Sequence, residues 1–371
     1  MKNLFKLTTA LLITTHLASA VELDAKSYYI YEPTTGTVVL EQNADMQISP
    51  ASLTKMMTVS LLFDALKAGE LTLDSELLVS EKAWRKGGSK MFIEVGKKVR
   101  VEDLIKGILV ASGNDACIVV AEYLGGTEES FAELMNQKAE DIGMYNTHFT
   151  NATGWPNPEQ LSTAKDMTKL ATYIIKNYPS FYKYFGLERF TYSNISQPNR
   201  NGLLRRAVGV DGMKTGHVDD AGYHLTASAE RDGVRLVSTV MGTTSMRKRE
   251  DETLAGLSYA FRTHEMVDVY KKGEVLEAAA PVLLGETETV PLAAQEALTL
   301  YLPKRENNYK VTTEYEKPLP APLKAGQKVG VAHVTLEDGT VRDVNLVATM
   351  AVPELTGVSR LWQQLKNAIS D

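Results

Sequence analysis

The chain has 371 residues, of which 44% are hydrophobic, and its 40 basic and 46 acidic side chains give a formal net charge of −6. This length and apolar content predict a buried core, divided between two domains. The acidic balance argues against nucleic acid as a partner. The single cysteine, Cys117, excludes an intramolecular disulfide and is expected to be a buried thiol. The histidines lack metal-ligand spacing and no phosphate-binding glycine loop occurs, so no metal or other cofactor is expected.

Residues 1–20 have the pattern of a secretory signal peptide. Two lysines precede an apolar run, and Ala18-Ser19-Ala20 matches an Ala-x-Ala cleavage site. A buried N-terminal helix is the alternative interpretation. The order of charged, apolar and small residues favours export, with a mature chain that begins near Val21.

A β-hairpin is predicted over Ser27 to Gln42, and the apolar run from Leu53 to Leu66 that follows is typical of a helix. In that helix Ser52 would lie in the first turn, and Lys55 would lie one turn later on the same face. A lysine can activate a serine hydroxyl when burial or neighbouring charge keeps its amine neutral. The N–H groups at the helix start would favour a developing oxyanion. This stretch therefore predicts a nucleophile beside a base.

The Ser-x-x-Lys pattern alone is a weak signal. It occurs four times, at Ser52, Ser162, Ser180 and Ser245. We interpret the copy at Ser162 as the N-cap of a helix over residues 163–177. Ser52 differs from the others because two further motifs follow it in order, Ser112-Gly113-Asn114 and Lys214-Thr215-Gly216.

The Ser112-Gly113-Asn114 motif interrupts two helices, predicted over Val101 to Val110 and from Ala116 to Tyr123. A connection between helices can direct both polar side chains into a cleft, whereas Gly and Asn are costly inside a helix. The alternative is a plain helix-breaking turn with Asn114 as a cap. The two companion motifs favour the functional interpretation.

Lys214-Thr215-Gly216 lies on, or at the entry of, a predicted strand that leads into alternating strands over Tyr223 to Ala229 and Val234 to Met241. On such a strand a lysine and a threonine hydroxyl can hold a carboxylate, and a glycine lets a substrate approach closely. A helix from Glu250 to Thr263 is expected to close this domain.

The pattern changes at Lys271 to short β-like runs that continue to Val352. They predict a small all-β domain without catalytic residues, which we interpret as a spacer or docking platform. After Pro353, apolar side chains of 358–369 line one face of a helix. The predicted organisation is a signal peptide (1–20), a catalytic domain (21–270), a β-rich domain (271–352) and an amphipathic segment (353–371).

The three motifs and the terminal segment closely resemble the membrane-anchored low-molecular-mass penicillin-binding proteins, the D-alanyl-D-alanine carboxypeptidases of bacterial cell-wall metabolism. The resemblance covers essentially the whole chain. It implies an α/β (α+β) penicillin-binding, serine β-lactamase-like transpeptidase domain with an antiparallel sheet and helices, followed by an all-β domain. It also implies cleavage of the terminal D-alanine from peptidoglycan stem peptides through an acyl-serine, and acylation of the same serine by β-lactams.

The resemblance assigns roles to individual residues. It implies that Ser52 is the nucleophile, that Lys55 is the general base and that Ser112 relays a proton to the leaving amine. Asn114 would hold the peptide, and the backbone N–H groups of Ser52 and His217 would form the oxyanion hole. The terminal carboxylate would lie beside Lys214, Thr215 and Gly216, with Arg200 and Arg249 nearby. A solvated surface arginine is the alternative interpretation for each of these last two residues.

The resemblance also implies a location on the periplasmic side of the cytoplasmic membrane. Trp362 would lie in the headgroup region, and Arg360 and Lys366 would meet lipid phosphates, although the segment is too short to span. A helix packed onto the β-rich domain is the alternative.

Three other functions are open. A D,D-endopeptidase would share the site, and a catalytically dead scaffold would have lost a motif. A class A β-lactamase would need a Glu-x-x-x-Asn loop, whereas Glu159 has no Asn at that spacing.

Overall fold

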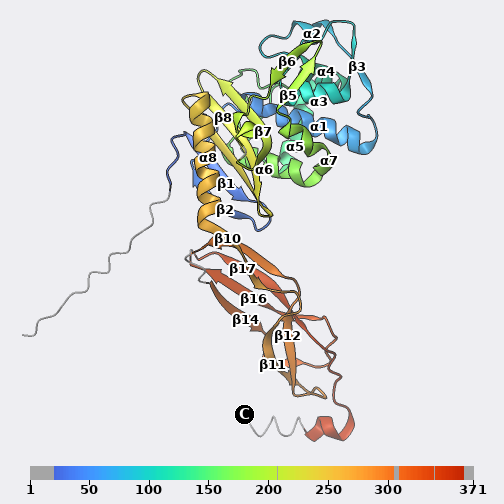
Figure 1. The fold of residues 1–371 in the computed structure, drawn as a ribbon. Helices are drawn as coiled ribbons and strands as arrows, with labels where there is room; N and C mark the ends of the chain where they lie inside the picture. The colour runs from blue at the N-terminus through green and yellow to red at the C-terminus, as the bar shows by residue number, and fades with distance from the viewer. Residues whose placement is uncertain (1–20, 207, 305–308, 338, 363–371) are drawn as a thin grey trace, which may run out of the picture.

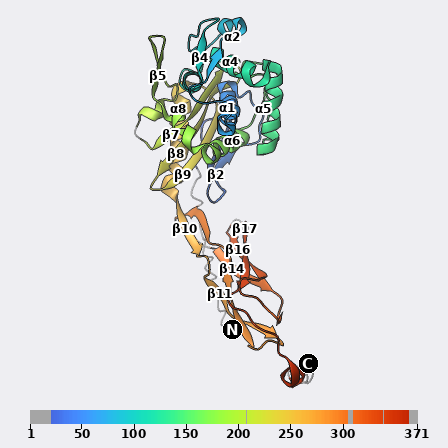
Figure 2. The same ribbon diagram turned by 90° about the vertical axis from the view of Figure 1, so that its right-hand side faces the viewer.

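The computed structural model describes residues 21–206, 208–304, 309–337 and 339–362. The predicted signal peptide lies outside the described residues. Figures 1 and 2 show a first domain of helices around a sheet, from which the last helix leads into an elongated β-rich second domain.

A five-stranded antiparallel sheet forms the centre of the first domain, in the order β2-β1-β9-β8-β7. The hairpin predicted over Ser27 to Gln42 is present as β1 and β2, and β1 also pairs with β9, the last strand of this sheet along the chain. The motif strand β7 lies at the edge. The strands are β1 (Ser27–Glu32), β2 (Thr37–Gln42), β7 (Val210–Val218), β8 (Gly222–Arg231) and β9 (Val234–Thr243).

Helices cover both faces of this sheet. On one face α8 (Met246–Thr263) packs Leu257 and Ala260 against apolar residues of the sheet. A Cβ at Gly256 would lie 2.2 Å from Ile30 Cδ1, so this glycine lets α8 approach β1 closely. On the other face α6 (Ala164–Asn177) joins the sheet to the helical part of the domain.

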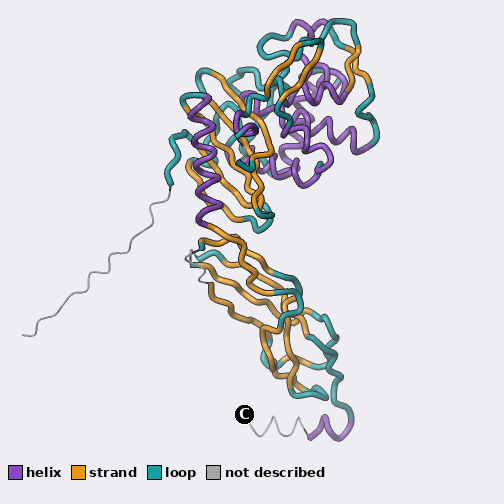
Figure 3. The backbone as a smooth tube through the Cα atoms, in the orientation of Figure 1, coloured by secondary structure: helices purple, strands orange, loops and turns teal. Residues whose placement is uncertain are grey.

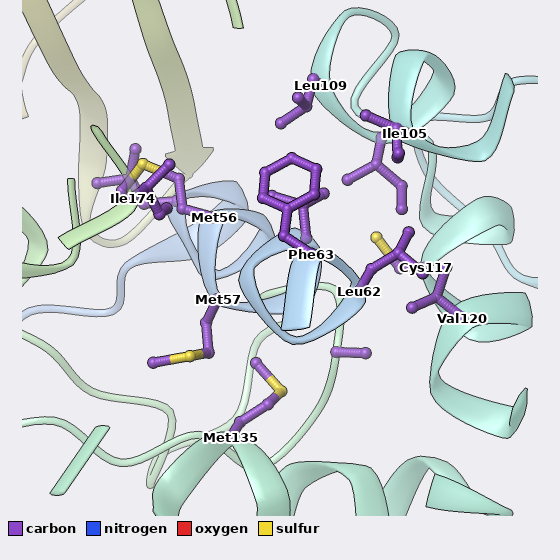
Figure 4. Packing of buried hydrophobic residues seen from close by; sticks show 14 of the residues in the cluster. Met56, Met57, Leu62, Phe63, Ile105, Leu109, Cys117, Val120, Met135 and Ile174 are labelled. Atoms are coloured by element: carbon purple, nitrogen blue, oxygen red, sulfur yellow. The ribbon is translucent and has the colours of Figure 1, made fainter. Parts of the chain in front are cut away.

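The helical part surrounds α1 (Lys55–Ala68), whose buried side chains include Met56, Leu62 and Phe63 (Figure 4). Cys117 lies in the same core, which confirms the expected buried thiol, and burial raises its pKa to about 12. The other helices are α2 (Glu81–Arg85), α3 (Val101–Leu109), α4 (Asn114–Gly125), α5 (Glu128–Ile142) and α7 (Pro179–Tyr182). Short elements complete the domain: η1 (Ala51–Thr54), η2 (Lys183–Gly186), η3 (Gly202–Arg205), β3 (Glu76–Leu78), β4 (Lys98–Arg100), β5 (Arg189–Tyr192) and β6 (Ile195–Pro198).

The expected N-cap of α6 was wrong by one residue. Thr163 caps the helix, because its side chain accepts the Asp166 N–H at 3.0 Å. Ser162 instead exchanges backbone hydrogen bonds with Ile48, and its Oγ lies 2.8 Å from Thr147 Oγ1. A residue held in that bridge cannot also cap the next helix.

The β-rich domain begins before the change of pattern at Lys271, because β10 (His264–Tyr270) continues directly from α8 and pairs with β13 (Leu298–Pro303). Figure 3 shows the remaining strands beyond this joint. They form a sheet in the order β14-β16-β17-β12-β11-β15. Its strands are β11 (Val275–Leu283), β12 (Thr289–Ala294), β14 (Tyr309–Tyr315), β15 (Leu319–Pro320), β16 (Lys328–Leu336) and β17 (Val341–Ala348).

A terminal helix begins at residue 357 and is described through residue 362, at the far end of the second domain (Figure 1). Its apolar side chains do not pack onto that domain, since Val358, Leu361 and Trp362 are 71%, 61% and 70% exposed. Arg360 forms an ion pair with Glu354 at 3.1 Å. Within the described residues, every helix is too short or too polar to cross a membrane.

The capping role of Thr163 is testable. Replacement of Thr163 by Ala removes the acceptor for the Asp166 N–H, so we expect the free energy of unfolding to fall by about 1 kcal/mol. Urea unfolding followed by circular dichroism measures the change. Ser180→Ala, at an exposed position of α7, is the control and should stay within about 0.5 kcal/mol of the parent. Equal stability of the two variants would contradict the assignment.

Candidate active site

Ser52 lies in the 3-10 turn η1, immediately before α1 rather than within it. Ala51 adopts a φ of 47°, a conformation that L residues rarely adopt. Lys55 is the first residue of α1 and is completely buried. Its Nζ donates to Ser52 Oγ at 2.9 Å and to the Thr153 carbonyl at 2.6 Å. The predicted pair is therefore in hydrogen-bond contact.

Burial lowers the pKa of Lys55 from 10.5 to about 8, because the interior disfavours its charged form. The sequence also predicts a contribution from the like charge of Lys214, the lysine of the third motif. In the structure the cations that lower the pKa of Lys55 are Lys86 and Arg200. Burial also holds the pKa of Lys214 well below its usual value, and Lys55 is the cation that contributes most to this shift, so the expected like-charge pair is present.

The Ser112-Gly113-Asn114 motif forms the predicted connection between α3 and α4. Ser112 is nearly buried and has a φ of 58°. The next side chain, Asp115, accepts the backbone N–H groups of Met91 and Phe92, each at 3.0 Å. These bonds hold the residues after α2 against the start of α4. They therefore also fix the position of the neighbouring Ser112-Gly113-Asn114 motif.

Asn114 is the first residue of α4, and its side chain does not cap the helix. Its Nδ2 donates to the Gly87 carbonyl at 2.9 Å, and its backbone N–H bonds to the Ser89 carbonyl at 2.7 Å. The plain-cap interpretation of Asn114 is therefore wrong, because the side chain points across to the neighbouring segment.

The edge strand β7 carries Lys214, Thr215 and Gly216 toward the serine turn. Lys214 is buried, and its Nζ bonds to the Thr215 carbonyl at 2.9 Å. A Cβ at Gly216 would lie 2.7 Å from the Pro50 carbonyl oxygen and 3.3 Å from Ala51 Cβ. A glycine is required here because the strand and the turn with the nucleophile are in contact.

The two arginines lie at one end of the cleft. Arg249 is buried, so the surface interpretation is wrong for it, and its Nη2 donates to the Arg200 carbonyl at 3.2 Å. Arg200 is exposed, and its Nη2 lies 3.5 Å from the Ala111 carbonyl, beside Ser112. The pair gives this end of the cleft a positive charge.

A cleft of about 550 Å³ contains most of the predicted residues. Ser52, Ser112, Thr215, Gly216, His217, Arg200 and Arg249 line it, together with Ser89, Ser196, Gln197, Pro198, Asn199, Tyr223 and Met246. Lys55 and Lys214 lie buried behind this lining, and His217 stacks on Tyr223 at 3.9 Å between ring centres. No carboxylate belongs to the lining among the described residues, and Glu159 is exposed in its loop.

Sequence reasoning missed the loop that orients the base. Asn151 Oδ1 accepts the backbone N–H groups of Thr153, Gly154 and Trp155, at 3.1, 2.9 and 3.0 Å. Gly154 has a φ of 80°, and a Cβ there would lie 1.8 Å from the Ala51 carbonyl oxygen. The turn-forming Asn151 and Gly154 were the available signal, but the sequence does not show that the Thr153 carbonyl meets Lys55.

The chain is similar to known proteins along most of its length. Residues 14–245 match the family described as D-alanyl-D-alanine carboxypeptidase, peptidase S11, and residues 264–354 match the C-terminal domain of penicillin-binding protein 5. The Escherichia coli D-alanyl-D-alanine carboxypeptidases DacA and DacC are 37% and 38% identical, each over 92% of this chain and over 87% and 88% of their own lengths. The crystal structure of Haemophilus influenzae penicillin-binding protein 5 superposes with a TM-score of 0.79 at 35% identity, over 90% of this chain and 99% of that one.

The contact at Gly216 generates a prediction about the site. Gly216→Ala should push β7 away from the serine turn and slow covalent labelling by a fluorescent penicillin about 100-fold, since misplacement by about 1 Å can cost this much. The labelling rate measures the effect, and thermal unfolding checks that the variant is folded. Labelling at the parental rate would show that β7 and the turn are not in the tight contact described.

Proposed function

Because the chain belongs to the D-alanyl-D-alanine carboxypeptidase family, we propose that it hydrolyses the bond before the terminal D-alanine of peptidoglycan stem peptides through an acylated Ser52. The observation that carries the proposal is the 2.9 Å contact between the buried Lys55 amine and Ser52 Oγ. The test is release of D-alanine from a stem pentapeptide.

In the proposed acylation, neutral Lys55 takes the proton of Ser52 while Oγ attacks the carbonyl carbon of the penultimate D-alanine. The backbone N–H groups of Ser52 and His217 stabilise the oxyanion. The proton then passes through Ser112 to the nitrogen of the leaving D-alanine, and the C–N bond breaks. Water hydrolyses the remaining ester, which returns the free serine.

The positive end of the cleft supports the placement of the substrate. Arg200, Arg249 and Thr215 line that end, with Lys214 behind it, and this set matches a terminal carboxylate. A peptide can lie along β7 as an added strand, because β7 is an edge strand. In this arrangement the scissile carbonyl would lie between Ser52 and β7, with Asn114 holding the peptide.

β-Lactams acylate the same serine in this proposal, since their amide takes the place of the scissile bond. The described part of the cleft offers no carboxylate to activate a deacylating water, unlike the glutamate of a class A β-lactamase. The described lining therefore does not favour a class A β-lactamase.

Ser52 should be the sole acylation site. Ser52→Ala removes the nucleophile, so a folded variant should show no covalent labelling by a fluorescent penicillin on a denaturing gel. Ser162→Ala and Ser180→Ala are the matched controls at two other Ser-x-x-Lys positions, and both should label normally. Labelling of folded Ser52→Ala would refute the assignment.

The pH dependence of acylation should follow Lys55. A base with a pKa of about 8 is mostly protonated below that pH, so the rate should fall about tenfold per unit as pH decreases below 7 and level off above about 9. Lys55→Arg keeps the charge but cannot deprotonate, and acylation should fall at least ~100-fold. Lys67→Arg, at an exposed position of the same helix, is the control. Near-normal acylation by Lys55→Arg would reassign the base.

We further propose that the chain is exported and that its terminal helix lies in the outer interface of the cytoplasmic membrane. Trp362 and its apolar neighbours are exposed, which suits an interfacial helix. Arg360 is engaged by Glu354, so the electrostatic attraction to lipid is weaker than the sequence suggested. The predicted Lys366 lies outside the described residues.

Truncation tests this placement. Removal of the residues after Leu355 keeps the hydrogen bond from the Leu355 N–H to the Leu284 carbonyl. The truncated β-rich domain should therefore remain folded. The truncated protein should be found in the soluble periplasmic fraction with unchanged D-alanine release. Trp362→Ser in the full chain should weaken membrane retention. Retention of the truncated protein in the membrane fraction would contradict the anchor.

A further inference from the structure

One carboxylate, that of Glu250, lies beside Arg249 at the positive end of the cleft. Glu250 follows Arg249 on α8, and its side chain is 19% exposed but outside the described lining of the cleft. Its Oε1 accepts the backbone N–H of Gly202 at 3.1 Å and lies 4.0 Å from Arg249 Nη2. The proposed reaction assigns no role to this side chain.

The segment at 199–202, which carries Arg200, is held on two sides. Asn201 is buried, and its Nδ2 donates to the Gly212 carbonyl of β7 at 3.0 Å. On the other side, the Gly202 N–H donates to Glu250 of α8. A Cβ on Gly202 would lie 2.4 Å from Glu250 Oε1, so a glycine is required for this approach. The segment is therefore fixed between β7 and α8.

Arg249 is a buried cation whose hydrogen bonds are incomplete. Its Nη2 donates to the Arg200 carbonyl at 3.2 Å, whereas its Nε has no hydrogen-bond partner among the described residues. Burial lowers the pKa of Arg249, and Glu250 is the acidic group that opposes this shift most. The guanidinium therefore keeps N–H groups available for a carboxylate while Glu250 stabilises its charge.

Charge and position lead to opposite expectations for Glu250. Its negative charge offsets part of the positive charge that attracts a substrate carboxylate, so electrostatics alone predict tighter binding when it is removed. Loss of the acceptor for the Gly202 N–H, in contrast, releases the segment that carries Arg200 and should weaken binding. The sign of the effect therefore separates the two roles.

We propose that Glu250 is a positioning residue that holds Arg200 and Arg249 in one arrangement, and that the preference for a substrate with a free terminal carboxylate depends on it. The inference rests on the proposed peptidase function and deepens it. Glu250 touches neither the substrate nor the reacting atoms. It acts through the Gly202 N–H and the Arg249 guanidinium.

The experiment compares two acetylated peptides that end in D-Ala-D-Ala, one with a free carboxylate and one with a carboxamide. Mass spectrometry measures release of D-alanine or D-alaninamide by the full-length protein, and the ratio of the two kcat/KM values reports the carboxylate preference. The parent should prefer the acid. Glu250→Ala should reduce the ratio about tenfold, mainly through a higher KM for the acid, because a charge-assisted hydrogen bond to the carboxylate is weakened.

Three further variants define the contact that matters. Glu250→Gln keeps an acceptor for the Gly202 N–H and should retain most of the ratio. Asp251→Ala, at the next position of α8, removes ion pairs with Arg206 and Arg247 and should leave the ratio unchanged. Gly202→Ala places a Cβ against Glu250 and should lower the ratio. Combined with Glu250→Ala it should cause no further loss, since both changes disrupt the same contact.

Each variant is compared with its own reaction on the amide, so the fraction of folded protein cancels from the ratio. Absence of D-alanine release by the parent would refute the proposed function. Release by the parent with an unchanged ratio in Glu250→Ala would refute the positioning role alone, as would a parent that cleaves acid and amide equally. An increased ratio in Glu250→Ala would show that Glu250 acts through its charge, which also contradicts positioning.

Discussion

The burial of one amine, that of Lys55, is the constraint on which the site depends. An ammonium removed from water without a counter-ion is unstable, and this shifts the pKa of Lys55 to about 8. The same burial leaves the amine two partners, Ser52 Oγ and the Thr153 carbonyl. The Thr153 carbonyl holds the amine in place, so the lone pair of the neutral form can accept the proton of Ser52 Oγ, 2.9 Å away. The burial of Lys55 therefore determines both where its amine lies and how basic the amine is.

Three distant segments must meet closely for that burial to occur. Gly154 and Gly216 approach the Pro50–Ala51 backbone from two sides, and a Cβ on either would clash with it. Ala51 takes a left-handed conformation between them. The turn that presents Ser52 is thus held by the loop at 151–155 on one side and by β7 on the other. The strain at Ala51 is sustained by the surrounding packing rather than by local sequence preference.

The sequence predicted the elements and the motifs well, and it failed where tertiary contacts decide. Serine, lysine and the two downstream motifs indicated the chemistry because their spacing reflects helix and strand geometry. The loop around Thr153 was missed, since its function is a backbone carbonyl, which any residue provides. Ser162 was mistaken for a cap because its bridge to Ile48 spans more than a hundred residues. Lys86 and Arg200, which also lower the pKa of Lys55, were missed for the same reason, because they are close to it only in the fold.

The joint between the domains has a mechanical consequence. Helix α8 passes into β10 without a linker, and Tyr301 of β13 donates back to the Ala260 carbonyl at 2.9 Å. This direct connection restricts movement of the β-rich domain relative to the first domain. The terminal helix lies at the far end of this domain (Figure 1). The β-rich domain therefore sets the distance between that helix and the cleft. In the proposed membrane-bound arrangement, the length of this domain would then decide which stem peptides the cleft can reach.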